Sequence, residues 1–372
     1  MKLSLLQENL SRGLGLVSHS VAVRATLPIL GNILIATDKG RLKLSATNLE
    51  TGINLWLGAK IEKEGSLTIP AKVLNEFISS LPPDKIELES KETTLLISTG
   101  VYKANFVGTA AGEFPKIPSF AGKPILVFEK DELVAALAQV AFAAAQDEGR
   151  PVLTGVLVKN QDGEKVTLVS TDGYRLSLKN IKTKEKKLEG DLLIPAKTLL
   201  EVSRLSQEKS GENQEIQVAL TEEKSQVIFS LSDVDFSSRL LEGEFPDFDK
   251  IIPRSSTTQT QLNKEEFTRA VKIASIFARE QANIVRLKIE EGRVLVSAET
   301  PQVGANESEV AAKTEGEALE IAFNCRFLLD FLGSTKGEEI ILETNSSLAP
   351  GVFKIKEDSS FLHIIMPVRI QS

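Results

Sequence analysis

The sequence predicts an α+β protein made of three tandem copies of one unit of about 125 residues. Two ten-residue segments are nearly identical, LTIPAKVLNE at 67–76 and LLIPAKTLLE at 192–201, and a fainter copy, EIAFNCRFLLDFLGS, occupies 320–334. In each copy an apolar, strand-like stretch leads into an amphipathic helix. The repeat is much longer than solenoid repeats of about 20 to 50 residues, so each copy is large enough to hold its own core.

Each unit is expected to begin with an amphipathic helix, because apolar residues recur there at helical spacing. The three helices are predicted at residues 3–18, 129–145 and 263–279. A β-hairpin follows each helix, at residues 30–48, 153–172 and 283–300. Each hairpin carries a glycine in its turn, as tight hairpin loops favour: Gly40, Gly163 and Gly292.

A second helix follows in each unit. Pro70 and Pro195 suit its first turn, where a missing N–H costs nothing, but the third copy lacks the proline. The expected order within a unit is therefore helix, hairpin, strands, helix and further strands. Such an order places the helices on one face of a mostly antiparallel sheet.

Linker-like segments separate the units. SFAGKP at 119–124 and IPRSSTTQT at 252–260 are rich in turn residues. We therefore expect three domains, at residues 1–122, 123–253 and 254–372.

Composition excludes several classes of protein. No apolar run approaches the length of a membrane span, and the first residues lack the apolar core of a signal peptide. We therefore expect a cytoplasmic protein with no membrane partner. The formal net charge of −7 argues mildly against nucleic acid, but a net charge averages over all faces and leaves room for a local basic stripe.

The sequence offers little material for catalysis. Its one cysteine, Cys325, and two histidines, His19 and His363, exclude an intrachain disulfide and a zinc site of the Cys/His kind. Glycine-rich phosphate loops and the common hydrolase and metalloprotease motifs are absent. We expect no catalytic residue, no metal and no cofactor, although an enzyme with an unrecognised carboxylate site stays open as an alternative.

Basic residues recur on the predicted helices. If pseudo-symmetry places the helices of all three units on one inner surface, their positive charges converge there. The residues that would form such a basic stripe, and so the candidates for contact with a nucleic acid, are Arg12, Arg24, Lys72, Lys197, Arg204 and Arg279. The alternative for each is a solvated charge on a helical face.

Several longer blocks carry a family resemblance. They are TLPILGNILI at 26–35, RPVLTGVL at 150–157, STDGYRLSL at 170–178, LEGEFPDFDKIIP at 241–253 and IIMPVRI at 364–370. On these blocks the whole chain resembles the bacterial β sliding clamps, the processivity subunits of DNA polymerase III.

The resemblance implies a fold of three tandem clamp domains, with helices lining a ring and antiparallel sheets outside. Two subunits would join head to tail as a homodimer around double-stranded DNA, with no chemistry of their own. The implied partners are the DNA polymerase III alpha subunit, the clamp loader subunits and other proteins that carry clamp-binding motifs. The acidic net charge agrees with a ring that slides, because tight phosphate contacts bind in a strongly salt-dependent way.

The resemblance also implies a hydrophobic pocket for short peptide motifs between domains two and three. The matching residues are Leu153, Thr171, Gly173, Tyr174, Arg175, Leu176, Pro246, Lys250, Ile251, Ile364, Met366, Pro367, Val368 and Arg369. Apolar walls with a flexible Met can accept Leu and Phe side chains, while Arg175 and Thr171 can bond the peptide backbone. Tyr174, Lys250 and Val368 depart from residues frequent in the family, which is expected to alter the rim of the pocket.

A different class of protein fits the same repeats. A three-domain scaffold that stays monomeric would bind partner proteins without encircling anything. Light scattering distinguishes the two, because a ring requires a species near twice the 40.5 kDa of one chain.

Overall fold

The structure is a computed structural model that describes residues 1–22, 27–147, 149–161, 163–208, 214–279, 282–301 and 304–369. Contacts divide the chain into two compact units. Unit 1 holds Met1–Lys130, Lys184–Lys187 and Glu201–Leu240, and unit 2 holds Asp131–Thr183, Leu188–Leu200 and the chain from Leu241 onward. Each unit is described by itself.

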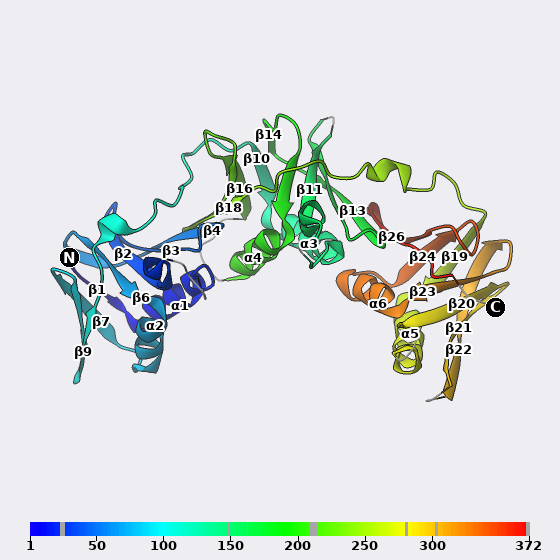
Figure 1. The fold of residues 1–372 in the computed structure, drawn as a ribbon, viewed down its shortest axis with the longest axis horizontal. Helices are drawn as coiled ribbons and strands as arrows, with labels where there is room; N and C mark the ends of the chain where they lie inside the picture. Colours follow the sequence, from blue (N-terminus) through cyan, green and yellow to red (C-terminus); the bar gives the residue numbers. More distant parts are fainter. Residues whose placement is uncertain are drawn as a thin grey trace. The chain divides into compact units, whose positions relative to one another are not determined.

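The three repeats share one order of elements (Figure 1). The first contains β1 (Lys2–Leu6), α1 (Gln7–Ser18), β2 (Asn32–Asp38), β3 (Arg41–Thr47), β4 (Thr51–Leu57), β5 (Lys60–Lys63), β6 (Ser66–Pro70), α2 (Ala71–Ser80), β7 (Lys85–Lys91), β8 (Thr94–Thr99) and β9 (Tyr102–Val107). The second contains β10 (Leu126–Glu129), α3 (Lys130–Val140), β11 (Gly155–Asn160), β12 (Lys165–Thr171), β13 (Arg175–Lys182), β14 (Glu185–Lys186), β15 (Leu192–Pro195), α4 (Ala196–Gln207), β16 (Glu215–Leu220), β17 (Gln226–Leu231) and β18 (Val234–Arg239).

The third repeat follows the same order with one strand fewer. It contains β19 (Thr258–Asn263), α5 (Lys264–Ala278), β20 (Ile284–Glu290), β21 (Arg293–Thr300), β22 (Gly304–Gly316), β23 (Leu319–Asn324), α6 (Cys325–Ser334), β24 (Glu339–Thr344), β25 (Gly351–Ile355) and β26 (Asp358–Ile365). The long strand β22 pairs first with β21 and then with β19. It therefore takes the place of two strands in the other repeats.

The structure corrects the predicted start of each unit. A strand precedes the first helix in every repeat, so residues 3–6 belong to β1 and α1 begins at Gln7. β1 is buried at Leu3, Ser4 and Leu5 and exposed at both ends, and it pairs with β7 on one side and β5 on the other. Its apolar residues suited a helical pattern equally well, because a short apolar run has no unique period. The same error placed Glu129, the end of β10, in the second helix.

The predicted hairpins are confirmed as β2–β3, β11–β12 and β20–β21, each antiparallel. Their turns need a left-handed backbone, which glycine supplies without strain. Gly40, Gly163 and Gly292 have φ of 74°, 73° and 80°.

Antiparallel sheets continue from one repeat into the next. In unit 1, β18 pairs with β4 inside a sheet of order β14-β10-β16-β17-β18-β4-β3-β2-β6. In unit 2, β13 pairs with β26 inside a sheet of order β15-β11-β12-β13-β26-β25-β24-β19-β22-β21-β20-β23. The strands of the second repeat are thus shared between the two units.

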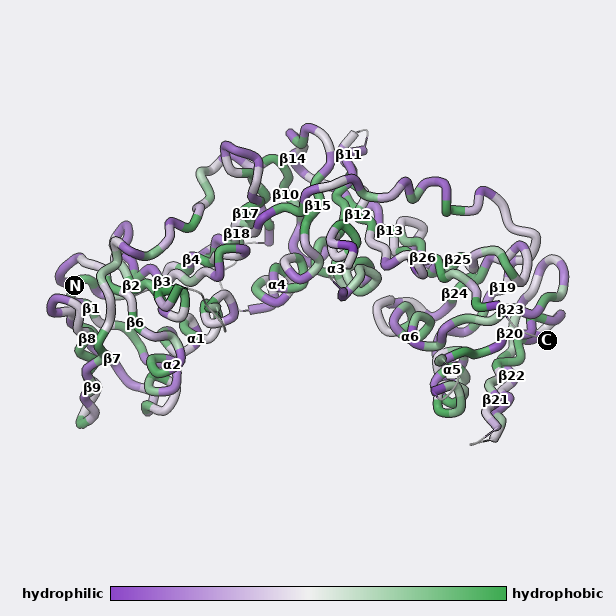
Figure 2. The backbone as a smooth tube through the Cα atoms, viewed as in Figure 1, coloured by the Kyte–Doolittle hydropathy of each residue, from purple (hydrophilic) through white to green (hydrophobic). Residues whose placement is uncertain are grey.

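Helix pairs bury the apolar faces of these sheets. In unit 1, α1 packs on α2 and on β3 and β4, and a Cβ at Gly13 would lie 2.7 Å from Leu57. In unit 2, α5 packs on β20–β22 and on α6, which contacts β23 and β26, and the core includes Phe267, Val271, Leu328 and Phe331. Figure 2 shows hydrophobic and hydrophilic residues alternating along α5. The polar face of each helix stays exposed for other contacts.

Candidate functional site

The candidate peptide site is centred on the pairing of β13 with β26 in unit 2. The register places Leu176 opposite Ile364 and Arg175 opposite Ile365. Leu176 and Ile364 are buried and pack in one apolar cluster with Phe248, which lies in the segment that links the second and third repeats. The structure therefore brings these two predicted site residues together, but as a buried layer and not as exposed contacts.

The exposed apolar residues of the candidate site lie in the sequence motifs that flank this layer. Tyr174, Ile251 and Met366 are 63%, 39% and 38% exposed. The N–H of Met366 donates to the carbonyl of Tyr174 at 2.8 Å, which fixes the end of β26 beside the start of β13. These three side chains are the ones that a ligand can reach without displacing core residues.

The remaining predicted residues near this layer differ in exposure. Leu153 is buried in a short 3₁₀-helix, Pro151–Thr154, and Pro246 is exposed. Exposed Lys250 forms an ion pair of 2.8 Å with Asp247. This hydrogen bond raises the pKa of Lys250 and lowers the pKa of Asp247.

Arg175 is only 8% exposed and is engaged within the chain. Its guanidinium donates to Asp172 at 3.1 Å, to Asp330 on α6 at 2.5 Å and to the carbonyl of Phe142 at 3.0 Å. It also stacks over the rings of Phe142 and Phe327, 5.3 and 4.5 Å from their centroids. Arg175 therefore ties β13 to α6 across the joint between two repeats.

Thr171 is engaged in a similar way. Its hydroxyl donates to the carbonyl of Arg175 at 2.6 Å and accepts from the N–H of Gly173 at 3.0 Å. Gly173 has φ of 93°, and a Cβ there would lie 3.1 Å from the guanidinium of Arg150. Bonding of a peptide backbone by Arg175 and Thr171 stays a prediction, since in this structure both side chains already stabilise the β12–β13 turn and the joint.

His363 lies under the same joint and was not predicted to belong to the site. It is fully buried, with Nδ1 2.7 Å from the hydroxyl of Ser177 and its ring stacked on Phe331 at 5.3 Å. Burial, with a smaller contribution from the charge of Arg175, lowers the pKa of His363 to about 3. The imidazole is therefore neutral at physiological pH.

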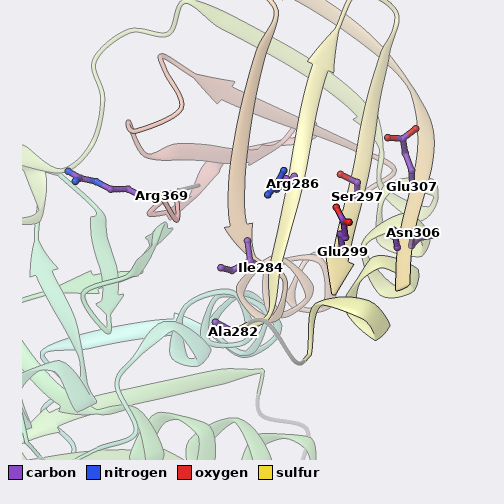
Figure 3. Close-up of a pocket in the computed structure, with 10 residues that line it drawn as sticks. Ala282, Ile284, Arg286, Ser297, Glu299, Asn306, Glu307 and Arg369 are labelled. Carbon is purple, nitrogen blue, oxygen red and sulfur yellow. The ribbon is translucent and has the colours of Figure 1, made fainter. Parts of the chain in front are cut away.

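The last predicted residues leave β26 and run to another strand. The N–H of Val368 donates to the carbonyl of Ala322 on β23 at 2.8 Å, and Pro367 is half-buried. Arg369 lines an open pocket of about 870 Å³ together with residues of β20, β21 and β22 (Figure 3). The C-terminal segment thus connects the candidate peptide site to a second surface.

The candidate DNA-binding residues differ in their surroundings. Arg12, Lys72, Lys197 and Arg279 are exposed. Arg204 is half-buried and donates twice to Glu201, at 2.7 and 2.9 Å, which raises the pKa of Arg204. Arg24 lies outside the described residues. Because Arg12, Lys72 and Arg204 belong to unit 1 and Lys197 and Arg279 to unit 2, their convergence on one surface stays a prediction.

Two exposed apolar surfaces were missed by sequence reasoning, one on a sheet edge and one on a helix. β9 ends its sheet and exposes apolar side chains: Val107 is 77% exposed, and Val101, which precedes the strand, 89%. On α5, which packs against β22, Ile273 and Ile276 are 39% and 54% exposed. Apolar residues on both faces of a strand would have been the sequence signal for β9. The same pattern is also typical of a buried strand, so it does not identify an exposed edge.

Other kinds of site are not indicated in the described ranges. No group of three or more His, Cys, Asp or Glu side chains there could hold a metal ion. Cys325 is buried in the core of the third repeat. Among the helices that the structure describes, none has the length and apolarity needed to cross a membrane.

Three family matches follow the three repeats. Residues 1–118, 127–247 and 249–369 match the N-terminal, central and C-terminal domains of the DNA polymerase III beta subunit. The fold and these matches define a three-domain sliding clamp. The chain belongs to the DNA polymerase III beta subunit family.

Relatives match over the full length. The chain is 31% identical to the beta sliding clamp of Synechococcus elongatus, covering 100% of both chains. It is 30% identical to that of Bacillus subtilis, covering 99% of this chain and 100% of the relative. Among solved structures, the DNA polymerase sliding clamp of Bacillus subtilis superposes with a TM-score of 0.93 at 28% identity, and the DNA polymerase III subunit beta of Pseudomonas aeruginosa with 0.92 at 26%, each covering both chains completely. The function of this protein is accordingly that of a DNA sliding clamp.

Proposed function

We propose that two copies of this chain close head to tail into a ring that encircles double-stranded DNA and tethers the replicative polymerase to it. The observation that supports this proposal is the rule followed by both joints within the chain. In each joint, the last strand of one repeat pairs with the third strand after the first helix of the repeat before it. These pairs are β18 with β4 and β26 with β13.

The rule leaves one strand of each type without a partner. β9 is the last strand of the first repeat. The first part of β22, Gly304–Ala311, is the third strand after the first helix of the third repeat. Among the described residues, β9 pairs only with β8 along its length, and this part of β22 only with β21. Pairing of β9 with β22 of a second copy would repeat the same joint. Such a contact joins unlike surfaces, which is the head-to-tail arrangement that closes rings.

Apolar residues support the same contact. Helix α2 lies beside β9, with the rings of Phe77 and Phe106 5.4 Å apart, and Val107 stands exposed on that strand. The helix beside β22 is α5, the first helix of the third repeat, which exposes Ile273 and Ile276. Exposed apolar residues along a free edge are costly unless a partner covers them.

The proposed ring carries no chemistry of its own. Its partners are the DNA polymerase III alpha subunit, clamp loader subunits that hydrolyse ATP to open the ring, and other proteins with clamp-binding motifs, all in the cytoplasm. Short apolar motifs of these partners bind at Tyr174, Ile251 and Met366. Arg12, Arg24, Lys72, Lys197 and Arg279 meet the phosphates of DNA, whereas Arg204 contributes less because Glu201 already pairs with it.

A topological experiment tests encirclement. Protein loaded by a clamp loader on circular DNA should stay bound through gel filtration at physiological salt. It should be lost soon after a restriction enzyme linearises the DNA, because a ring slides off a free end. Retention on linear DNA with free ends would instead indicate ordinary electrostatic binding, which salt weakens steeply.

A further inference from the structure

The open pocket that Arg369 lines carries a pattern of charges to which the proposed sliding-clamp function assigns no role. It lies on the face of β20, β21 and β22 opposite the face that packs on α5, where buried Val285, Leu287 and Val296 point the other way. Its charged lining residues are Arg286 on β20, Glu299 on β21, Glu307 on β22, and Arg369. None of these four side chains has an ion-pair partner among the described residues.

The register of the sheet orders these charges. Arg286 pairs with Ser297, and Ser297 pairs with Glu307, so one row crosses the three strands. Arg369 follows Val368, which bonds to β23 at the near edge of the same sheet. Across the strands, starting from the C-terminal segment, the charges therefore run positive, positive, negative, negative: Arg369, Arg286, Glu299 and Glu307. Figure 3 shows the labelled residues spread across the strands in this order.

The pocket is continuous with the candidate peptide site through one short segment. Met366 bonds to Tyr174 at that site, Val368 bonds to Ala322 on β23, and Arg369 lines the pocket. A chain that leaves the peptide site past Met366 therefore reaches the pocket directly. Four strand spacings of about 4.8 Å separate the C-terminal segment from β22, a distance that about six extended residues span.

We propose that this pocket is an extension subsite for the partner segment that flanks the clamp-binding motif, and that it selects a segment with acidic residues next to the motif and basic residues further away. This inference rests on the proposed peptide site and specifies the partner that it takes. The acidic residues pair with Arg369 and Arg286, and the basic residues pair with Glu299 and Glu307. Because the pocket is open to solvent, the pairs add modest affinity and mainly confer selectivity.

Fluorescence anisotropy with labelled peptides tests the inference on the full-length protein. A core peptide carries only the motif QLSLF. Extended peptides add a six-residue segment with two acidic and then two basic residues, at either the amino or the carboxyl end of the motif. We expect one extended peptide to bind about fivefold tighter than the core peptide in low salt, and the gain to shrink as salt is raised. Reversing the charge order of the segment should remove the gain.

Matched variants assign the gain to the pocket. Arg286→Glu together with Glu299→Lys, which avoids the strand of the proposed dimer contact, should abolish the gain for the original segment and restore it for the reversed segment, while the core peptide binds as before. Lys288→Glu is the control, since Lys288 lies on the same strand and is exposed but does not line the pocket. A gain that is absent, or that survives in the double variant, overturns the inference. Failure of the core peptide to bind would instead refute the proposed peptide site.

Discussion

The guanidinium of Arg175 on β13 lies 2.5 Å from the carboxylate of Asp330 on α6, and so joins the second repeat to the third beneath the candidate peptide site. The two partners are unequally buried, at 8% and 48% exposure of the side chain. Removal of Arg175 leaves the largely buried carboxylate of Asp172 without its charged partner. Removal of Asp330 leaves a guanidinium that keeps its other bonds.

We therefore expect Arg175→Ala to lower the free energy of unfolding by about 3 to 5 kcal/mol and Asp330→Asn by about 1 kcal/mol. Urea denaturation followed by circular dichroism measures both. Arg269→Ala is the control, because it breaks an exposed ion pair with Glu265 on α5 and should shift the midpoint little. Equal effects of the two variants at the joint would contradict the asymmetry argued here.

His363 should make the protein less stable as the pH falls. Its folded pKa of about 3 lies below the value of about 6.5 expected in the unfolded chain. The unfolded state therefore takes up a proton that the folded state refuses, and stability is lost as the pH drops from 6.5 toward 3. The loss from this one residue can reach about 4 to 5 kcal/mol.

The variant His363→Asn keeps a hydrogen-bonding group near Ser177 but does not titrate. We expect it to be less stable than the parent at pH 7, yet to lose less stability between pH 6.5 and pH 4. The only other histidine, His19, is exposed, and His19→Gln is the control. A pH dependence of His363→Asn that matches the parent would show that other groups dominate the acid response.

Peptide binding should depend on the exposed apolar residues of the candidate site. Met366→Ala combined with Ile251→Ala should weaken a QLSLF-type pentapeptide by about tenfold or more, because each truncated side chain contributes on the order of 1 kcal/mol or more of apolar contact. Leu200→Ala removes a similarly exposed apolar side chain elsewhere and should leave affinity unchanged. Substitution of Leu176 is a poor test, since this side chain is 2% exposed and belongs to the core.

Contacts of Lys72 and Lys197 with DNA phosphates should make the affinity for DNA depend on the salt concentration. Lys72→Ala with Lys197→Ala should slow loading onto DNA and reduce the slope of log affinity against log salt by about 0.9 for each lost phosphate contact. Lys60→Ala with Lys165→Ala, two exposed lysines on strands, is the control. Identical slopes for both double variants would place Lys72 and Lys197 away from the DNA.

Dimerisation should depend on the free edge of β9. Val107→Lys places a charge where the proposed contact needs an apolar residue, so light scattering should show a shift from dimer toward monomer. Leu49→Lys, also at an exposed apolar position, should stay dimeric. A dimer that withstands Val107→Lys and Ile276→Lys together would require a different contact surface.

The sequence was sufficient for the repeat, the hairpins and the second helix of each unit, because glycine turns and helical spacing are local signals. It was not sufficient for β1, whose apolar residues fitted a helix, nor for the sheets that continue between repeats. Those sheets depend on pairs such as Leu176 with Ile364, which lie far apart in the chain and leave no periodic trace.

The candidate site shows the same limit. The motif STDGYRLSL indicated the segment that carries Thr171, Gly173 and Arg175, and the structure shows that Gly173 has a left-handed backbone there. It could not reveal that Arg175 is held by Asp330 and Phe327, residues that come about 150 positions later. Nor could it separate buried Leu176 from exposed Tyr174, because burial depends on the neighbouring repeat.

The shared sheets also matter during synthesis of the chain on the ribosome. Strand β4 pairs with β18, whose residues are made about 180 positions later, and β13 waits for β26 over a similar interval. At about 5 to 20 residues per second, each of these strands presents an unpaired edge for roughly 10 to 40 seconds. During that time a nascent chain can pair with a neighbouring nascent chain on the same messenger RNA. Chaperones that cover exposed strands of nascent chains should therefore raise the yield of the native protein more than its final stability suggests.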